Sequence, residues 1–296
     1  MTTRQDILRA VLWMSGAVAS FLIMAFAGRA LSTSLDTFEI MTWRSLTGVA
    51  IMVTLITARG AWGRISTRRM GLHIGRNIAH FTGQNLWFYA VAVIPVAQVF
   101  ALEFTSPLWV LVLSPLVLGE RLTLMRVLAA GLGFVGILMV TRPGTQELSP
   151  GVIAAACAAI GFAVTMVTTK RLTRDVPTLS IIFWMTVTQT VMGLICGGYD
   201  LDFALPTAET LPLLVLVGCC GLFAHFCVTS ALSFAPATVV VPIDFTRLPL
   251  AVLLGVLFLG EPFDLWVLAG AVVIFAGNVV NIRSETRPRP VALDAT

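Results

Sequence analysis

Charged side chains are scarce in this sequence. Asp, Glu, Lys and Arg make up 11% of its 296 residues, whereas a typical soluble domain has about 25%. So few ionisable groups cannot cover a surface exposed to water, but a surface in contact with lipid needs none. The scarcity therefore excludes an ordinary soluble domain. With 57% hydrophobic residues and a mean hydropathy of +0.93, the composition indicates an integral membrane protein.

Sequence motifs for metals, nucleotides and catalysis are also missing. The Walker pattern GxxxxGK[ST] does not occur, and the cysteines show neither CxxC nor Cys/His spacing. We therefore predict no metal, no cofactor and no enzymatic activity, and we expect the cysteines to be small buried apolar residues. They are Cys157, Cys196, Cys219, Cys220 and Cys227. The net charge of +4 reflects basic residues in the predicted loops, so it does not indicate nucleic-acid binding.

Apolar segments follow one another along the chain with short connections. About 20 apolar residues are enough for a helix to cross the hydrocarbon core of a bilayer. The sequence therefore predicts an all-α integral membrane fold of ten transmembrane helices, the first of which is retained rather than cleaved as a signal peptide. The expected segments are 7–29, 39–58, 71–94, 97–118, 122–141, 150–170, 179–197, 211–234, 238–259 and 264–282.

The distribution of Lys and Arg predicts the orientation of these helices. If the N-terminus lies in the cytoplasm, 14 of the 19 basic residues fall in cytoplasmic segments, two in outer segments and three within helices. Cytoplasmic loops of membrane proteins are enriched in Lys and Arg, so this split favours that orientation. We predict that both termini face the cytoplasm, which requires an even number of helices.

The sequence also matches itself at a fixed offset of 141 residues. Chance alignment of apolar stretches would not pair tryptophan, proline, an acidic residue and a Gly-Glu dipeptide. The matches include Trp43 with Trp184, Pro95 with Pro236, Glu103 with Asp244, Phe104 with Phe245, and Gly119-Glu120 with Gly260-Glu261. We predict two five-helix repeats, residues 1–142 and 150–283, and a cytoplasmic tail at 284–296. Because five is odd, the second repeat enters the membrane from the opposite side.

The predicted inverted repeat indicates a class of function. Inverted repeats are typical of secondary transporters, which bind substrate near the middle of the membrane between the repeats. Two related halves can exchange conformations, which suits alternating access. Channels can be built in the same way, and a membrane enzyme acting on lipid-linked substrates is a further alternative. Such an enzyme needs clustered carboxylates or histidines, whereas the acidic residues of the predicted loops are scattered.

Two octapeptides in the repeats resemble a known family. LVLGERLT at 116–123 and LFLGEPFD at 257–264, with Pro95 and Pro236 before the fourth helix of each half, are similar to the EamA-type carriers of the drug/metabolite transporter superfamily. Within that superfamily the chain resembles bacterial exporters of amino acids, aromatic ones included, and of related metabolites. The resemblance implies gradient-driven export by a multi-pass protein of the bacterial inner membrane.

The third predicted helix carries a polar stripe. His73, Asn77, His80, Gln84 and Phe88 are spaced by four, three, four and four residues, so they lie on one helical face. Polar side chains that face lipid are unfavourable, so this face should point into the protein. We expect Asn77, His80 and Gln84 to bind substrate in a cavity. Hydrogen bonding between helices is the alternative role for the same groups.

Several charged residues lie deep within predicted helices, where each needs a partner or a function. Arg44 could pair with Glu103, and Asp244 could pair with Arg247 three residues later or with Arg76. Two cations, Arg44 and Arg247, and two anions would suit the carboxylate and ammonium groups of a zwitterionic substrate. Fixed salt bridges between helices explain the same residues equally well. Because His80, Glu103 and Asp244 can titrate, proton coupling and facilitated diffusion are both open.

Aromatic residues recur at matching positions of the two repeats. Trp43, Phe104 and Trp184 could form the apolar walls of a cavity, or they could pack in the core. By contrast, the fifth and tenth helices are rich in glycine and almost free of polar residues, so we expect them at the periphery. There they would support the bundle or form a dimer contact, and a homodimer and a monomer are equally compatible with the sequence.

The principal hypothesis is a secondary transporter that exports amino acids or related small metabolites by alternating access. Its partners would be the small-molecule substrate and membrane lipid. The predicted substrate-binding residues are His80, Gln84, Asn77, Arg44, Glu103, Asp244, Arg247, Trp43, Trp184 and Phe104.

Overall fold

A computed structural model describes residues 4–119, 124–142, 148–199, 202–235, 240 and 243–286. These ranges contain helices and connecting turns, without a β-strand. The helices are α1 (Arg4–Leu31), α2 (Thr37–Ala58), α3 (Met70–Val93), α4 (Val96–Glu103), α5 (Ser106–Leu118), α6 (Leu124–Thr141), α7 (Pro150–Leu172), α8 (Thr178–Gly197), α9 (Thr210–Phe234), α11 (Arg247–Leu259) and α12 (Leu265–Thr286). A short 3-10 helix, η1 (Trp62–Arg64), lies between α2 and α3.

Six helical spans are long and apolar enough to cross a membrane by length and composition. They are α1, α2, α7, α8, α9 up to Val228, and α4 with α5 taken together over Val96–Val117. Shorter apolar stretches lie in α6, α11 and α12, and α3 has 24 residues but carries the polar stripe. The predicted all-helical class is therefore confirmed for the described residues. The number of crossings and the side on which the termini lie stay predictions.

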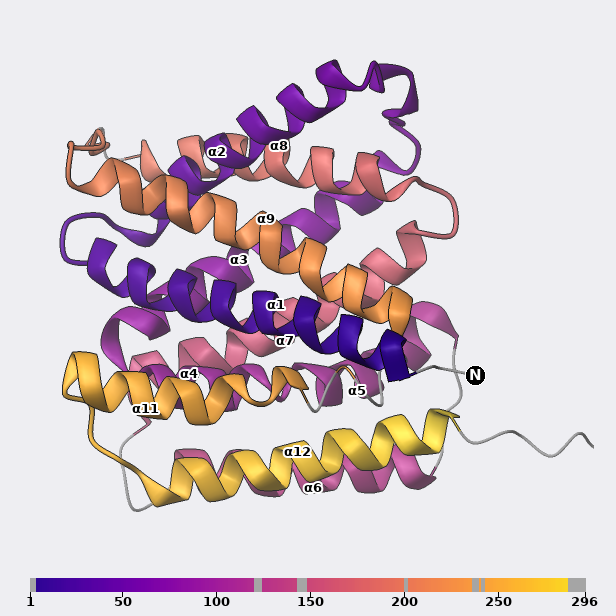
Figure 1. Cartoon of the computed structure of the whole chain (residues 1–296), viewed down its shortest axis with the longest axis vertical. Helices are drawn as coiled ribbons and strands as arrows, with labels where there is room; N and C mark the ends of the chain where they lie inside the picture. The colour runs from indigo at the N-terminus through magenta and orange to yellow at the C-terminus, as the bar shows by residue number, and fades with distance from the viewer. Residues whose placement is uncertain are drawn as a thin grey trace, which may run out of the picture.

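Helices of the first half pack against helices of the second half. α1 contacts α9, α3 contacts α7, α2 contacts α8, α4 contacts α11, and α6 contacts α12. Figure 1 shows the bundle as successive tiers, from α2 and α8 at the top to α6 and α12 at the bottom. At the 141-residue offset, α1 corresponds to α7 and α3 to α9. The α1–α9 contact is therefore the counterpart of the α3–α7 contact, and the two halves share one interior.

The bundle has two ends, which we name after α1. This helix begins at the Arg4 end and finishes at the Leu31 end, and α12 finishes back at the Arg4 end (Figure 1). α3 also finishes at the Leu31 end, where Arg29 donates a hydrogen bond of 2.5 Å to the carbonyl of Ile94. α7 starts there, because Gly151 lies against Ile94. α1 and its repeat counterpart α7 thus run in opposite directions, as an inverted repeat requires.

The pair formed by α6 and α12 lies at one edge of the bundle, as predicted for the fifth and tenth helices (Figure 1). Glycines bring the two backbones close together. A Cβ at Gly136 would lie 2.8 Å from the carbonyl oxygen of Gly270, and a Cβ at Gly270 would lie 2.8 Å from that of Gly136. Small residues at such a contact let membrane helices gain van der Waals packing.

Adding a methyl group at this contact is expected to destabilise the protein. In a Gly136→Ala variant the new Cβ would press on backbone, and such overpacking typically costs about 1–3 kcal/mol. Gly131→Ala on the same helix is the matched control, because no atom lies within 4 Å of its added Cβ. Unfolding midpoints in mixed detergent micelles, followed by circular dichroism, would compare the two. Equal midpoints would contradict the proposed close packing.

The expectation that the cysteines are buried is wrong for two of them. Cys157 and Cys219 are exposed, whereas Cys220 and Cys227 are buried. The surface of a membrane helix is apolar because it faces lipid, so an apolar sequence context cannot separate buried from exposed positions.

Candidate functional site

Two groups of polar side chains lie deep within the bundle. The first surrounds a cavity lined in part by Arg44 and His225, which we call the Arg44 cavity. The second consists of Glu103, Asp244 and Arg247, which we call the Arg247 cluster. Helices from both halves of the chain contribute to each group.

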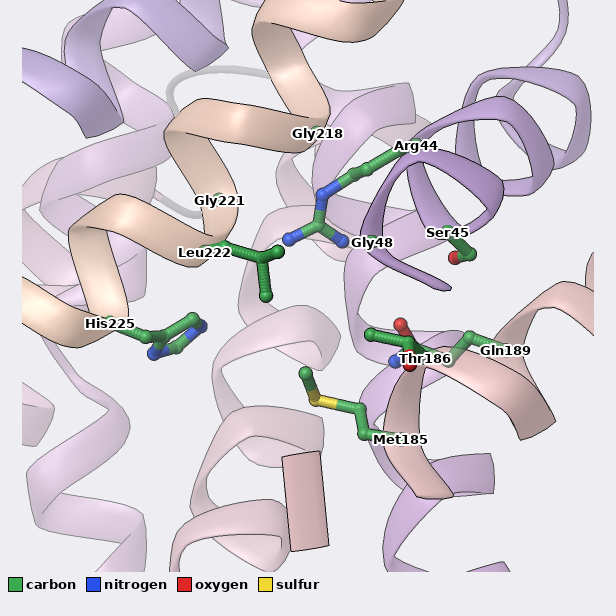
Figure 2. Close-up of a pocket in the computed structure, with 10 residues that line it drawn as sticks. All are labelled: Arg44, Ser45, Gly48, Met185, Thr186, Gln189, Gly218, Gly221, Leu222 and His225. Carbon is green, nitrogen blue, oxygen red and sulfur yellow. The ribbon is translucent and has the colours of Figure 1, made fainter. Parts of the chain in front are cut away.

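The Arg44 cavity lies between α2, α8 and α9 and has a volume of about 20 Å³, which is room for about one water molecule. Figure 2 shows the lining residues converging on it, which are Arg44, Ser45, Gly48, Met185, Thr186, Gln189, Gly218, Gly221, Leu222 and His225. The lining therefore presents both polar and apolar surface, and a metabolite would enter only in a conformation in which this cavity is wider.

Arg44 is the cation of this cavity. The residue is 8% exposed, and its guanidinium group projects from α2 into the space beside α9 (Figure 2). Gly221 permits this position, because a Cβ there would lie 2.7 Å from a terminal nitrogen of Arg44. Among the described residues, the guanidinium makes a single weak hydrogen bond, 3.6 Å long, to the sulfur of Met41. It forms no ion pair with any carboxylate that the structure describes.

Two histidines lie beside the cavity. The Nδ1 atom of His80 on α3 is 2.5 Å from the side-chain nitrogen of Gln189 on α8, so the amide can donate to it. The His80 ring centroid is 6.5 Å from that of His225 on α9 and 6.1 Å from that of Phe162 on α7. His80 is buried, whereas His225 keeps an exposed surface where it lines the cavity. The site therefore offers ring faces as well as hydrogen-bonding groups.

Arg76 and Asn77 on α3 take part in a network of neutral partners. Arg76 donates to the hydroxyl group of Thr169 and to the side-chain carbonyl of Asn77, both at 2.8 Å. Asn77 donates to the backbone carbonyl of Trp184 at 3.1 Å and to the hydroxyl group of Thr188 at 2.6 Å. These bonds hold α3 against α7 and α8. They also leave Arg76 without a carboxylate partner within the described ranges.

The Arg247 cluster forms where two helices are interrupted. α4 ends at Glu103 and α5 begins at Ser106, and a turn at 245–246 precedes α11 at the repeat-related position. Arg247 is 2% exposed and donates to Glu103 at 3.1 Å and to Asp244 at 3.5 Å. Interrupted helices that bring charged groups to mid-depth are a common feature of transporters.

Aromatic rings complete the surroundings of Arg247. The centroids of Phe21, Phe100 and Phe104 lie 4.6, 4.6 and 4.7 Å from its guanidinium carbon, within the range of cation–π interactions. Glu103 accepts a further hydrogen bond of 2.7 Å from the indole nitrogen of Trp87. Arg247 is thus surrounded by protein groups that balance its charge.

The predicted pairing of the deep charges is right in one case and wrong in two. Asp244 pairs with Arg247, as the three-residue spacing predicts. Glu103 pairs with Arg247 rather than with Arg44, because α11 packs on α4 whereas Arg44 lies between α2 and α9. Arg76 bonds to neutral groups and not to Asp244. A sequence shows how deep a residue lies, but not which side of the bundle it faces.

The polar stripe of α3 points inward, as predicted. Its five members are all buried: His73, Asn77, His80, Gln84 and Phe88. Of these, His80 reaches the Arg44 cavity through Gln189. The side-chain oxygen of Gln84 and both ring nitrogens of His73 make no hydrogen bond to the described residues.

The predicted aromatic residues do not line the Arg44 cavity. The indole nitrogen of Trp43 donates to the carbonyl of Ala204 at 3.4 Å, and that of Trp184 donates to the carbonyl of Ser66 at 2.9 Å. Phe104 packs in the Arg247 cluster. Repeat symmetry placed these rings at matching depths but could not assign them to one cavity.

Sequence reasoning does not identify Gln189 and His225 as site residues. His225 is an isolated polar residue in an apolar run, and Gln189 lies among threonines, so neither belongs to a stripe like that of α3. The sequence offered one indication for His225, namely that the chain has only three histidines.

A separate set of contacts ties helices together at the Leu31 end. α11 ends at Gly260, whose φ of +63° is a left-handed conformation that favours glycine. The chain then turns so that the carboxylate of Glu261 accepts from the guanidinium group of Arg29 on α1. The same carboxylate accepts from the backbone N–H of Val96 at 3.0 Å, at the positive N-terminus of α4. We call these contacts the Glu261 junction.

The Glu261 junction accounts for the repeated Pro and Gly-Glu motifs. Pro95 precedes α4, and Gly260-Glu261 follows α11, so the motif residues of opposite halves meet. Beside them, Arg142 after α6 forms an ion pair with Asp264 before α12. The repeat counterparts of Pro95 and Glu261, which are Pro236 and Glu120, lie outside the described residues.

An all-helical membrane bundle with a polar site between two related halves defines the class of multi-helix membrane transporters. The chain belongs to the EamA-like transporter family, whose sequence profile matches residues 8–142 and again residues 149–283. The family membership predicted from the repeated motifs is therefore confirmed.

Curated relatives carry the names of metabolite transporters. The chain is 24% identical to the S-adenosylmethionine uptake transporter of Rickettsia prowazekii over 281 residues, which cover 95% of this chain and 94% of that protein. It is 31% identical to the riboflavin transporter of Rhizobium johnstonii over 217 residues, covering 73% and 71% of the two chains. The riboflavin transporter of Brucella anthropi is 29% identical over 245 residues, covering 80% and 86%.

A solved structure, described only as a crystal structure of protein, shares the fold. It superposes with a TM-score of 0.65 over 94% of this chain and 99% of its own, with 19% sequence identity. A likeness at this identity supports the arrangement of helices and carries no information on cargo.

Proposed function

We propose that this chain is a secondary transporter that moves a small polar metabolite through the Arg44 cavity by alternating access. The observation that carries the proposal is the cavity itself, where Arg44 of the first half faces Gln189 and His225 of the second. A site between inverted repeats is open to either side in turn when the halves exchange conformations. The basic residues favour cytoplasmic termini, and we assign the protein to the inner membrane of a bacterium, with repeats at 1–142 and 150–283 and a tail at 284–296.

The names of the relatives favour a particular kind of cargo. S-adenosylmethionine and riboflavin each join a planar nitrogen heterocycle to a polar chain, and the ring of His225, which lines the cavity, can contact such a plane. These names give no support to export of amino acids, which the resemblance had implied. We therefore propose uptake of a metabolite with a planar ring and polar substituents.

Counterflow in proteoliposomes tests the transport itself. Vesicles preloaded with unlabelled S-adenosylmethionine, riboflavin or an amino-acid mixture would be diluted into the same labelled compound. A carrier accelerates entry of label when preloaded and saturates with concentration. Entry without saturation or exchange would favour a channel, and chemical conversion of the label, followed by chromatography, would favour an enzyme. Absence of counterflow for every compound would contradict the proposal for these cargos.

A His80→Ala variant is expected to lower transport about tenfold or more, because Gln189, which lines the cavity, loses the partner of its side-chain amide. His73→Ala is the matched control, since His73 is a buried histidine on the same helical face whose ring nitrogens bond to none of the described residues. Initial rates should be normalised to the folded protein recovered from size-exclusion chromatography. Similar rates for the two variants would exclude His80 from the transport site.

A further inference from the structure

We infer that Arg44 binds an anionic group of the transported metabolite, either a carboxylate or a phosphate. The inference rests on the proposed function and specifies the cargo of the same cavity. It separates two cations that the sequence treats as equivalent, Arg44 and Arg247. Arg247 already contacts two carboxylates, whereas Arg44 contacts none in the described chain.

Other buried or half-buried arginines show what Arg44 lacks. Arg29 pairs with Glu261, Arg142 with Asp264, and Arg247 with Glu103 and Asp244. An isolated charge removed from water costs several kcal/mol unless a counterion or water compensates it. Arg44 is 8% exposed, yet its guanidinium group points into a small cavity and not toward a described carboxylate (Figure 2).

A second cation strengthens the positive potential of this region. Arg76 donates two hydrogen bonds to neutral groups, and it has no ion pair within the ranges that the structure describes. Both guanidinium charges lie within electrostatic range of His80 and His225. The carboxylate of Glu39, on the same helix as Arg44, accepts instead from the backbone of Asp36 and Ala204. No described acid therefore neutralises the cavity.

The geometry suits a planar or tetrahedral oxyanion. A guanidinium group presents parallel N–H donors that match the two oxygens of a carboxylate or phosphate. The side-chain amide of Gln189 and the ring of His225 line the same cavity and can contact the rest of the ligand. Gly218 and Gly221 let α9 pack closely against α2, because an added Cβ would lie 2.7 Å from Thr47 at the first position and 2.7 Å from the Arg44 guanidinium group at the second.

Two pairs of compounds test the inference by binding alone. S-adenosylmethionine and its decarboxylated analogue differ by a carboxylate, and riboflavin 5′-phosphate and riboflavin differ by a phosphate. Equilibrium binding to the purified full-length protein would be measured for the wild type, Arg44→Gln and Arg59→Gln. Arg59 is the control, because it is an exposed arginine at the end of α2.

In one of the two pairs, the anionic compound is expected to bind the wild type at least about tenfold more tightly than the compound without the anion. A preference in the first pair identifies a carboxylate as the ligand of Arg44, and a preference in the second pair identifies a phosphate. Arg44→Gln should abolish that preference and Arg59→Gln should keep it. The inference is overturned if neither pair shows the preference or if the preference survives in Arg44→Gln. Arg44→Lys, which keeps the charge but not the planar fork, should restore part of it.

Counterflow with the same proteins separates this inference from the proposed function. Binding that depends on Arg44, without counterflow of any compound, contradicts transport but leaves the anion site in place. If the wild type prefers an anionic compound and counterflow of that compound is unaffected by Arg44→Gln, transport stays in place and the anion site is overturned.

Discussion

An Arg247→Met variant should be far less stable than the wild-type protein. The substitution removes the only described cation that contacts Glu103 and Asp244, at 3.1 and 3.5 Å, and leaves both carboxylates without it. Removing one partner of a buried ion pair typically costs about 3–5 kcal/mol, because the remaining charge stays buried without compensation. The rings of Phe21, Phe100 and Phe104 would also lose their cation.

Arg44→Met is the matched control for this prediction. It makes the same substitution at another arginine that is less than one-tenth exposed, but one without a carboxylate partner among the described residues. Its stability should equal or exceed that of the wild type, because no carboxylate is left unpaired. Unfolding in dodecylmaltoside with increasing SDS would measure both variants. Equal losses would contradict the distinction between a structural arginine and a ligand-binding one.

A rescue experiment identifies the cause of the loss at Arg247. Adding Glu103→Gln and Asp244→Asn to Arg247→Met replaces both carboxylates with neutral amides of similar shape. The triple variant should recover part of the lost stability, since the penalty comes mainly from unpaired charge. If it is as unstable as Arg247→Met, the loss reflects packing of the guanidinium group against the aromatic rings instead.

Substitution of Glu261 should produce the second large effect. Glu261→Ala removes the acceptor of the Arg29 guanidinium group and of the Val96 backbone N–H at once. The Glu261 side chain is 8% exposed and that of Arg29 is 20% exposed, so we expect a loss near the lower limit for buried pairs, about 3 kcal/mol. Glu261→Gln keeps an acceptor but not the charge, and it should lose less.

An exposed ion pair provides the control for the Glu261 junction. Arg69 and Asp175 lie 3.0 Å apart, with their side chains 50% and 29% exposed. Ion pairs of this kind contribute about 0–1 kcal/mol, so Arg69→Gln should scarcely change the unfolding midpoint. If Glu261→Ala and Arg69→Gln have the same small effect, the junction does not stabilise the Leu31 end.

The same junction bears on the conformational cycle of the proposed transporter. At the Leu31 end, the junction joins α1 and α4 to Glu261, which lies in the connection between α11 and α12. It therefore opposes separation of α1 and α4 from this connection. Loss of the junction should raise the fraction of molecules that are open at the Leu31 end. The size of the shift is set by the difference in contact free energy between the closed and the open state. Distances between spin labels at this end would rise in Glu261→Gln if the junction holds that end closed.

Much of the architecture follows from the sequence, because membrane insertion imposes simple rules. Apolar runs of the required length predicted most helices where the structure has them, and the spacing of His73 to Phe88 predicted an inward face. The single helix predicted at 97–118 is wrong, because α4 and α5 are separated by a turn, and the helix predicted at 238–259 has a turn before α11. The Pro and Gly-Glu motifs pointed to the correct family. The three-residue spacing of Asp244 and Arg247 predicted their contact, since that spacing brings two side chains to one side of a helical turn.

The residues of the candidate site could be predicted from the sequence only in part. The sequence places Arg44 and Glu103 at similar predicted depths, and depth alone allowed them to pair. His225 stands alone in an apolar run and Gln189 has a threonine on each side, so neither shows a polar periodicity that would give its direction. The sequence pattern therefore indicated that a polar interior exists, but not which side chains share a cavity.

By itself, the sequence determined that this protein is helical, lies in a membrane and is built from two related halves. Those properties depend on composition, run length and internal repetition, which are local or additive along the chain. Only the tertiary structure decided that Arg247 is neutralised by Glu103 and Asp244 while Arg44 faces a cavity without a described counterion. That difference depends on which helix packs beside which, α4 against α11 and α2 against α9, and on the rotation of each helix about its axis. A buried charge acquires its role from the neighbours that such packing gives it.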